Sequence, residues 1–286
     1  MQTKMFKILA TAIIMIFLFG FVSGVAAAGK PQANFSKSNG QADISTGQAT
    51  ISVNGGGNVP FYHIKLNNSN DTTTYEVKFS SIQEFVDKNG NGLFDNGEAV
   101  PSSGISFPSL KWDFSGFYST NDSNNNIQTI NFNFTSTSTT KGPFIQLRNH
   151  IDVSKGNQIK FDLLISDYKW TSTNSSAKLA VKFQIAGGNL TQGANNNDIS
   201  FGNAQFSSVS TASTPDGNIN VNTQIASGNS FYLLYDHFNS NFTHDPTFSA
   251  VVSTTSSSTK GLSLGLYPIV GGLAIIGIVF AKKRHI

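Results

Sequence analysis

Short runs in which apolar and polar residues alternate one by one dominate this chain between its two ends. In the segment INFNFTS, Ile130, Phe132 and Phe134 fall on one side of an extended strand, and the polar residues between them fall on the other. Such alternation indicates half-buried β-strands, and no run between the ends has a helical apolar stripe. The sequence therefore predicts an all-β fold, an antiparallel β-sandwich of about ten strands. The clearest runs are ATISVNG, FYHIKLN, YEVKFSSI, IQTINFNFTS, IQLRNHIDV, IKFDLLISDYKW, KLAVKFQIAG, NINVNTQI, FYLLYDHF and TFSAVVS.

The composition suits a large apolar core that is built without disulfides. The chain has 24 Phe and no Cys among its 286 residues. A domain of more than about 200 residues buries enough apolar surface to fold unaided, and aromatic side chains bury the most area per residue. A division into two smaller sandwiches near residues 186 to 200, which are rich in Gly and Asn, is the alternative.

The N-terminal segment predicts a secretory signal peptide over residues 1 to 28. Lys4 and Lys7 form a basic start, an apolar run follows from Ile8 to Phe21, and three alanines end the segment at Ala28. Signal peptides have their basic, apolar and small-residue regions in this order. An uncleaved membrane anchor is the alternative, because the apolar character continues nearly to the alanines.

The C-terminal segment predicts a single membrane span over residues 261 to 281. That segment carries no charge, and about 20 apolar residues cross a hydrocarbon core of about 30 Å as a helix. The basic tail at residues 282 to 286 places its own end in the cytoplasm by the positive-inside rule. Residues 253 to 260 form a Ser/Thr stalk before the span. This layout predicts a single-pass cell-membrane protein whose ectodomain, residues 29 to 252, is extracellular.

The positive net charge of the chain belongs to its ends. The net charge is +3, from 19 basic and 16 acidic residues. Without the six basic residues near the ends, 13 basic residues face the 16 acidic ones, so the ectodomain is mildly acidic. A mildly acidic domain argues against a nucleic-acid partner. The six terminal residues are Lys4, Lys7, Lys260, Lys282, Lys283 and Arg284.

The segment DKNGNGLFDNGE, residues 87 to 98, matches the twelve-residue calcium-loop template at every required position. The template asks for oxygen side chains at positions 1, 3 and 5, a Gly at position 6 and a Glu at position 12. Gly92 supplies the sharp turn, and Phe94 is expected to point into the core. All the candidate ligands are oxygen donors, which suits Ca²⁺ over zinc or copper. They are Asp87, Asn89, Asn91, Leu93 through its carbonyl, Asp95 and Glu98.

The flanks of the loop differ from those of an EF-hand. The preceding SSIQEFV is consistent with one helical turn or a strand end, and Pro101 rules out the usual exit helix. We therefore expect a structural ion and not a switch. Three carboxylates favour weak binding, with a Kd on the order of 10⁻⁴ to 10⁻³ M. A simple hairpin is the alternative, because Asn89-Gly90 and Asn91-Gly92 are each good type I′ turns.

Several features of the chain combine into one layout. These are a signal peptide, an Asn-, Ser- and Thr-rich β-domain containing DKNGNGLFDNGE, a Ser/Thr stalk, a single span and a KKR tail. The layout resembles that of archaeal cell-surface proteins, including those that carry an EF-hand-like loop on a β-sandwich. TKGLSLGLYP, before the span, lacks the Pro-Gly-Phe sorting motif of many such proteins. The resemblance implies other cell-envelope proteins or glycans as partners.

Two sets of residues relate the chain to carbohydrate. A carbohydrate-binding platform is one interpretation of Trp112, Tyr118, Tyr168 and Trp170, with the two Trp residues as ligand-binding candidates; core packing is the other. In an exported chain, Asn-x-Ser/Thr sequons are candidates for N-glycosylation. The eight sequons lie at Asn34, Asn67, Asn70, Asn121, Asn133, Asn174, Asn189 and Asn241.

No motif of the chain indicates an enzyme. GLSLG, residues 261 to 265, fits the serine-hydrolase pattern G-x-S-x-G but lies at the membrane span with no strand before it. A glycosidase would need two carboxylates held close together in a cleft. The sequence therefore predicts a calcium-binding surface protein with a structural, adhesive or ligand-display role. A carbohydrate-binding surface receptor and a surface-anchored hydrolase are the alternatives.

Overall fold

Strands and turns make up nearly all of the described part of the chain. The only helix in those residues that is long enough to name is the 3-10 turn η2 (Phe107–Ser109). This content confirms the all-β prediction. All the described residues belong to one compact unit that ends at Val252. The computed structural model describes residues 32–36, 41–45, 49–54, 59–66, 73–137, 143–153, 158–193 and 196–250.

Four segments that the sequence assigns to export and anchoring lie outside the described residues. They are the signal peptide at 1 to 28, the stalk at 253 to 260, the span at 261 to 281 and the tail at 282 to 286. Within the described ranges, no helix is long and apolar enough to cross a membrane.

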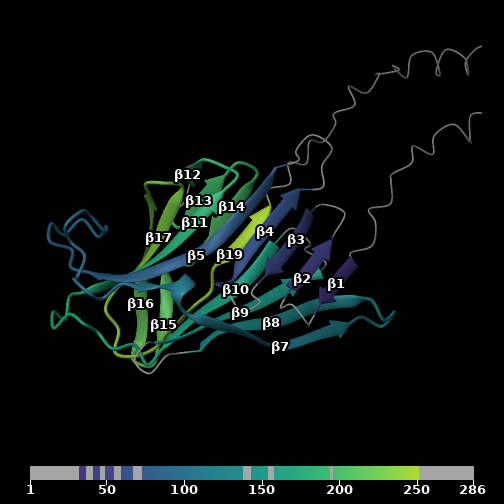
Figure 1. Ribbon diagram of the computed structural model, residues 1–286, viewed down its shortest axis with the longest axis horizontal. Coiled ribbons are helices and arrows are strands. Elements are labelled where there is room, and N and C mark those ends of the chain that lie inside the picture. The colour runs from purple at the N-terminus through teal and green to yellow at the C-terminus, as the bar shows by residue number, and fades with distance from the viewer. Residues whose placement is uncertain are drawn as a thin grey trace, which may run out of the picture. The chain divides into compact units, whose positions relative to one another are not determined.

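Nine strands pair into a first antiparallel layer (Figure 1). A two-residue strand, β6 (Ile105–Ser106), pairs with β5 (Thr74–Phe85) on the same edge as β4 (Phe61–Leu66). In spatial order, the strands of this layer are β1 (Gln32–Ser36), β2 (Gln41–Ser45), β3 (Ala49–Asn54), β4 (Phe61–Leu66), β5 (Thr74–Phe85) with β6 (Ile105–Ser106), β11 (Lys178–Ala186), β17 (Ser230–Tyr235) and β16 (Gly217–Ala226).

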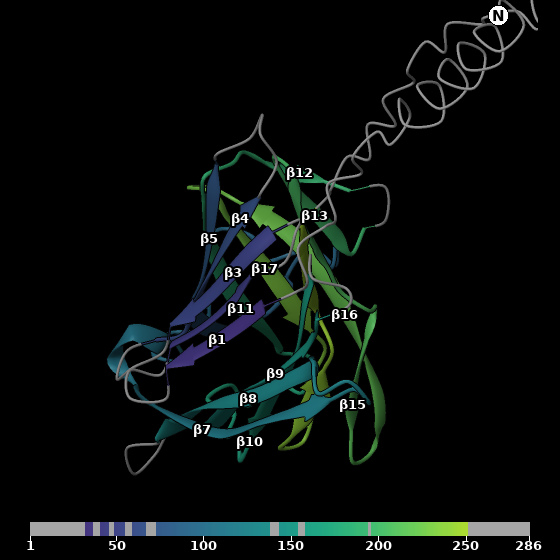
Figure 2. The same cartoon turned by 90° about the vertical axis from the view of Figure 1, so that its right-hand side faces the viewer.

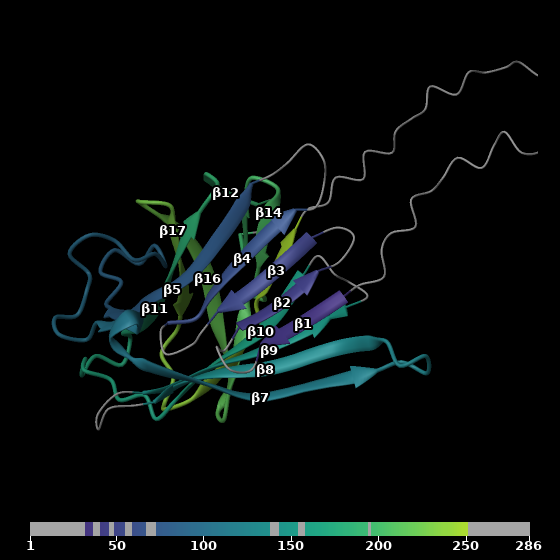
Figure 3. The ribbon, with the colours of Figure 1, turned by 45° about the vertical axis from the view of Figure 1, so that its right-hand side comes forward.

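The remaining ten strands form a second antiparallel layer, which lies across from the first in Figures 2 and 3. Strand β16 links the two layers, because Asn220 pairs with Thr211 of the second layer and Val221 pairs with Tyr235 of the first. The second layer begins with β7 (Lys111–Asn121), β8 (Ile127–Thr137), β9 (Phe144–Asp152) and β10 (Gln158–Ser166), in this spatial order. The other edge of β10 pairs with two short strands in succession, β18 (Phe242–His244) and β19 (Thr247–Ala250). Strand β18 pairs in turn with β15 (Thr211–Thr214), and β19 is followed by β14 (Ala204–Ser207), β13 (Asp198–Phe201) and β12 (Leu190–Gln192).

Aromatic rings from both layers meet in the core between them. Phe161 of the second layer packs against Tyr62 and Phe79 of the first, with ring centroids 6.0 and 5.6 Å apart. Phe183 of the first layer packs against Phe248 of the second at 6.4 Å. The Tyr62 hydroxyl also donates a 2.5 Å hydrogen bond to Asn149 Oδ1 across the core. These contacts hold the inner faces of the two layers together.

The alternation in the sequence gives the strand faces correctly. Ile130, Phe132 and Phe134 are all buried, and each of the ten alternating runs overlaps a strand. The described residues form nineteen strands and not about ten, because strands of two to four residues such as β12 to β15 are too short to show a period. Phe183 and Phe206 pack at 5.7 Å, so one core spans the segment where two sandwiches were the alternative.

Candidate functional site

The loop at residues 87 to 98 connects β5 to β6, and the residues on either side of it pair with each other. Phe85 forms a β-bridge with Ala99, and the amide of Val86 donates to the carbonyl of Glu98 at 3.0 Å. Because β5 runs to Phe85, the segment before the loop is a strand end, one of the two expectations for it. No exit helix follows, as Pro101 predicts; a turn leads into β6.

The acids at the first and last positions of the loop are held by backbone amides. The amides three and five residues beyond Asp87 donate to its two oxygens at 2.7 and 2.8 Å. The amides of Lys88 and Asp95 donate to the two oxygens of Glu98 at 2.8 and 2.9 Å. Glu98 is only 5% exposed. The last acid therefore folds back across the loop and ties its second residue to its ninth.

The side chains at loop positions 3, 5 and 9 meet at one carboxylate oxygen. Nδ2 of Asn89 and Nδ2 of Asn91 donate to Asp95 Oδ2 at 2.9 and 2.8 Å. These hydrogen bonds, with that from Asn89 the larger, lower the pKa of Asp95 below its ordinary value. The two amide oxygens accept the backbone N–H two residues further on, at 3.0 and 2.8 Å. Both Asn side chains are thereby fixed in the loop.

The backbone of the loop does not form the type I′ turns of the hairpin alternative. Gly92 has φ of +78°, which is the left-handed conformation that position 6 requires. A type I′ turn needs positive φ at both central residues. Neither Asn89 nor Asn91 is among the described non-glycine residues with positive φ, so neither Asn-Gly pair forms such a turn.

Phe94 and Gln224 attach the loop to the outer face of the first layer. The amide of Phe94 donates to Gln224 Oε1 at 2.8 Å, and Gln224 Nε2 donates to the Phe94 carbonyl at 3.2 Å. The Phe94 ring lies 4.9 Å from that of Phe85 and 5.3 Å from that of Tyr232. This small cluster is separate from the main core. Phe94 is therefore half-buried against a second, smaller apolar cluster on the outer face, and not in the main core.

The donor set of the loop fits a hard cation. Asp87, Asp95 and Glu98 bring three carboxylates, and amide and carbonyl oxygens supply the other donors that Ca²⁺ takes. To present Oδ1 beside Asp95, the two Asn amides would turn about their last torsion and give up the hydrogen bonds that their oxygens accept from the backbone. In the described ranges, no group of three His, Cys, Asp or Glu side chains is spaced to hold a metal. The three loop carboxylates therefore do not form such a group as they stand, and a cage would also need the uncharged oxygens.

Only one of the four platform candidates offers its ring to solvent. Trp112 is 2% exposed and its indole N–H donates to the Phe107 carbonyl, so the structure places this ring in the core. Tyr168 is also buried, and Trp170 is half-buried with its indole N–H on the Phe238 carbonyl. Tyr118, by contrast, is 57% exposed.

The sequons differ in how they are presented. Asn121, Asn174 and Asn189 are exposed, whereas Asn133 and Asn241 are half-buried. Asn241 also accepts the Asp167 amide at 3.0 Å. Asn34 lies in β1 without a described side chain, and two sequons, Asn67 and Asn70, lie outside the described residues.

Two carboxyl groups interact at β10, that of Asp162 within the strand and that of Asp245 next to it, which the sequence did not indicate. Burial, followed by the hydrogen bond with Asp245, raises the pKa of Asp162. Burial acts to raise the pKa of Asp245, but the hydrogen bonds with Asp162 and Lys160 outweigh it, so the pKa of Asp245 is lowered. Each of the two carboxyl groups also bonds to a basic side chain, Asp162 to His150 at 3.1 Å and Asp245 to Lys160 at 2.8 Å.

The segment DHFNSNFTHD, residues 236 to 245, contains two histidines, and their side chains do not converge on one ligand. His237 stacks on Trp170 with ring centroids 4.3 Å apart. His244 is buried, and its two ring nitrogens bond to the Tyr235 hydroxyl and the Val209 carbonyl. Both rings thus have structural partners. The GLSLG segment lies outside the described residues.

The fold and the loop define an all-β protein with a twelve-residue loop rich in oxygen ligands. No family model and no curated protein matches the chain. Among solved structures, it is similar to an alpha-mannosidase from Enterococcus faecalis V583, with 10% identity and a TM-score of 0.41. That match covers 76% of this chain and 30% of the other. The chain thus spans less than a third of that enzyme, and a likeness this distant implies nothing about activity.

Proposed function

We propose that this chain is a single-pass cell-surface protein whose β-sandwich ectodomain is stabilised by Ca²⁺ bound in the loop at residues 87 to 98. The proposal rests on one observation above all: the side chains of Asn89, Asn91 and Asp95 meet at a single oxygen, while Glu98 closes over the same loop. The role would be structural, adhesive or ligand-displaying, with envelope proteins or glycans as partners, and not enzymatic.

The physical basis is the linkage between binding and folding. Calcium that binds only the folded loop adds RT ln(1 + [Ca²⁺]/Kd) to the free energy of unfolding. For 1 mM calcium and a Kd between about 10⁻³ and 10⁻⁴ M, the gain is about 0.4 to 1.4 kcal/mol. In a domain of this size such a gain raises Tm by about 1 to 5 °C. The loop is fixed to the first layer by Phe94 and Gln224, so ordering it should stabilise that layer.

A thermal melt of the full chain in EDTA and in 1 mM calcium tests the proposal. The matched variant carries Asp87→Asn and Glu98→Gln, which remove two charges with little change of shape. The control is Asp122→Ala, because Asp122 accepts the backbone N–H of Asn124 and Asn126 in an exposed turn outside the calcium template. We expect calcium to raise Tm in the wild type and the control only. A wild type that does not respond to calcium would refute the calcium part of the proposal.

A further inference from the structure

Tyr118 lies on the outer face of the second layer because of an irregularity in β7. Ser115 pairs with Asn133, but Tyr118 pairs with Asn131, so β7 has one residue more than β8 over this stretch. Gly116, inside the bulge, has φ of +65°. In regular pairing, residue 117 would stand opposite Asn131. The bulge therefore turns Tyr118 outward, which is a common use of bulges beside binding sites.

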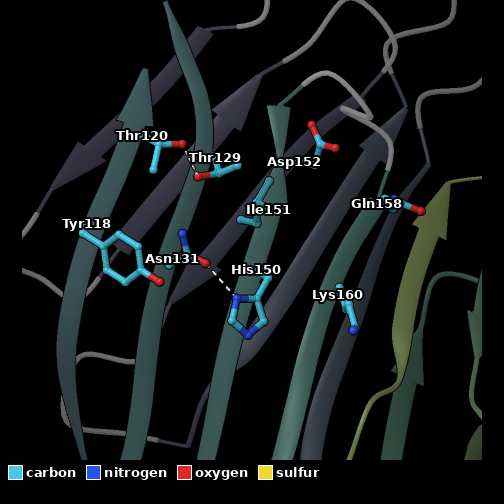
Figure 4. A pocket seen from close by; sticks show the side chains of 9 residues that line it. All are labelled: Tyr118, Thr120, Thr129, Asn131, His150, Ile151, Asp152, Gln158 and Lys160. Atoms are coloured by element: carbon cyan, nitrogen blue, oxygen red, sulfur yellow. Dashed lines mark hydrogen bonds between the residues drawn. The ribbon is translucent and has the colours of Figure 1, made fainter. Parts of the chain in front are cut away.

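A row of polar side chains continues from Tyr118 across the neighbouring strands. Asn131 pairs with His150, and His150 pairs with Lys160, so the row crosses four strands (Figure 4). Three strand spacings make the row about 14 Å long. The hydroxyls of Thr120 and Thr129 bond to each other at 2.6 Å one step along the same strands. The exposed ring of Tyr118 thus lies at one end of a row of side chains that can form hydrogen bonds.

The polar groups of this row are held in fixed orientations. His150 Nδ1 bonds to Asn131 Oδ1 at 2.7 Å, and His150 Nε2 bonds to Asp162 Oδ2 at 3.1 Å. Lys160 donates to Asp245 Oδ2 at 2.8 Å. Side chains that are already fixed lose little conformational entropy when a ligand binds. The row is thus pre-organised.

The same residues line a cavity of about 450 Å³, which is within the usual range for small-ligand sites. We propose that this cavity binds a short, neutral oligosaccharide, with the Tyr118 ring against the C–H face of one sugar and the polar row bonding to its hydroxyls. Its lining includes Asp152 and Lys160, of opposite charge, and the Lys160 charge is already paired with Asp245. An anionic ligand would find no net positive charge among these groups, and a sugar needs none. This site does not depend on the calcium loop.

Binding of neutral hexasaccharides to the full chain tests this proposal. The probes are maltohexaose, cellohexaose and mannohexaose, with a hyaluronan hexasaccharide as the anionic comparison, and binding is measured by calorimetric titration. Tyr118→Ala should weaken binding roughly tenfold or more, whereas Tyr118→Phe keeps the ring and should stay within about threefold of wild type. Val209→Ala is the control, because Val209 is also an exposed apolar residue, 50% exposed, outside this cavity.

Each outcome decides for or against the site. Binding of at least one neutral probe that Tyr118→Ala alone removes would support it. The proposal is overturned if no neutral probe binds, if the hyaluronan fragment binds best, or if Val209→Ala weakens binding as much as Tyr118→Ala. A circular-dichroism melt of each variant separates loss of the site from loss of folding, since the exposed Tyr118 side chain contributes little to the core.

Discussion

Acid should destabilise this protein through one buried histidine, His244. Its Nε2 lies 2.9 Å from the Val209 carbonyl, so that nitrogen carries the proton, and its Nδ1 accepts from the Tyr235 hydroxyl at 2.9 Å. The side chain is 1% exposed. Burial lowers the pKa of His244 from 6.5 to about 4. The folded state therefore keeps this ring neutral at pH values where the unfolded chain protonates it.

The sign and size of the effect follow from the two pKa values. Between pH 6.5 and pH 4 the unfolded chain binds more protons, so the free energy of unfolding falls as the pH falls. A shift from 6.5 to about 4 makes this loss about 2 kcal/mol between pH 7 and pH 5, and about 3 kcal/mol by pH 4. The effect is large against a typical total stability of about 5 to 15 kcal/mol.

Urea unfolding at pH 7 and pH 5, followed by tryptophan fluorescence, measures this loss. His244→Gln keeps an amide donor and acceptor for the same two partners but does not titrate. Asp245 senses the charge of His244, but its pKa is lowered from 3.8 and so lies below this pH interval. The difference between the two pH dependences therefore reports mainly on His244. We expect the wild type to lose about 2 kcal/mol more than the variant over this interval. Equal losses in the two proteins would refute the reasoning.

Three further substitutions test contacts around the loop and the core by urea unfolding. Phe94→Ala should cost about 2 kcal/mol, roughly half the value for a fully buried Phe, and no change would mean that the loop does not dock on its layer. Glu84→Gln should cost about 2 to 3 kcal/mol, because this buried carboxylate accepts three hydrogen bonds, one from the amide of Ser172, and an amide brings a donor there. Tyr62→Phe should cost about 1 to 3 kcal/mol by leaving Asn149 Oδ1 unpaired in the core; a neutral result would show that the amide finds another partner.

Features that depend on local pattern were predictable from the sequence. The side-chain period of two placed Ile130, Phe132 and Phe134 on the buried face, because an extended strand admits only two faces. The template of the loop likewise predicted the left-handed conformation of Gly92, since its spacing fixes where the chain must turn. Both predictions concern residues close together in the chain.

Features that depend on pairing between distant segments were not predictable. The Tyr118 ring faces outward only because β7 contains one more residue than β8, and register cannot be seen in either strand alone. The hydrogen bond between the Phe94 amide and Gln224 joins the loop to a strand 130 residues further along the chain. Trp112 shows the converse: aromatic composition suggested a platform, but only burial distinguishes a core ring from an exposed one.

The two candidate sites lie on different layers, and this separates their functions. The loop docks on the outer face of the first layer through Phe94, whereas Tyr118 and His150 belong to the second layer. The layers share the aromatic core and the linking strand β16, but no residue is common to the loop and the cavity lining. On the two proposals, calcium changes the stability of the protein without changing the orientation of the side chains that line the proposed sugar site. Ligand affinity and calcium-dependent stability are then independent properties, and each can be measured in a variant that has lost the other.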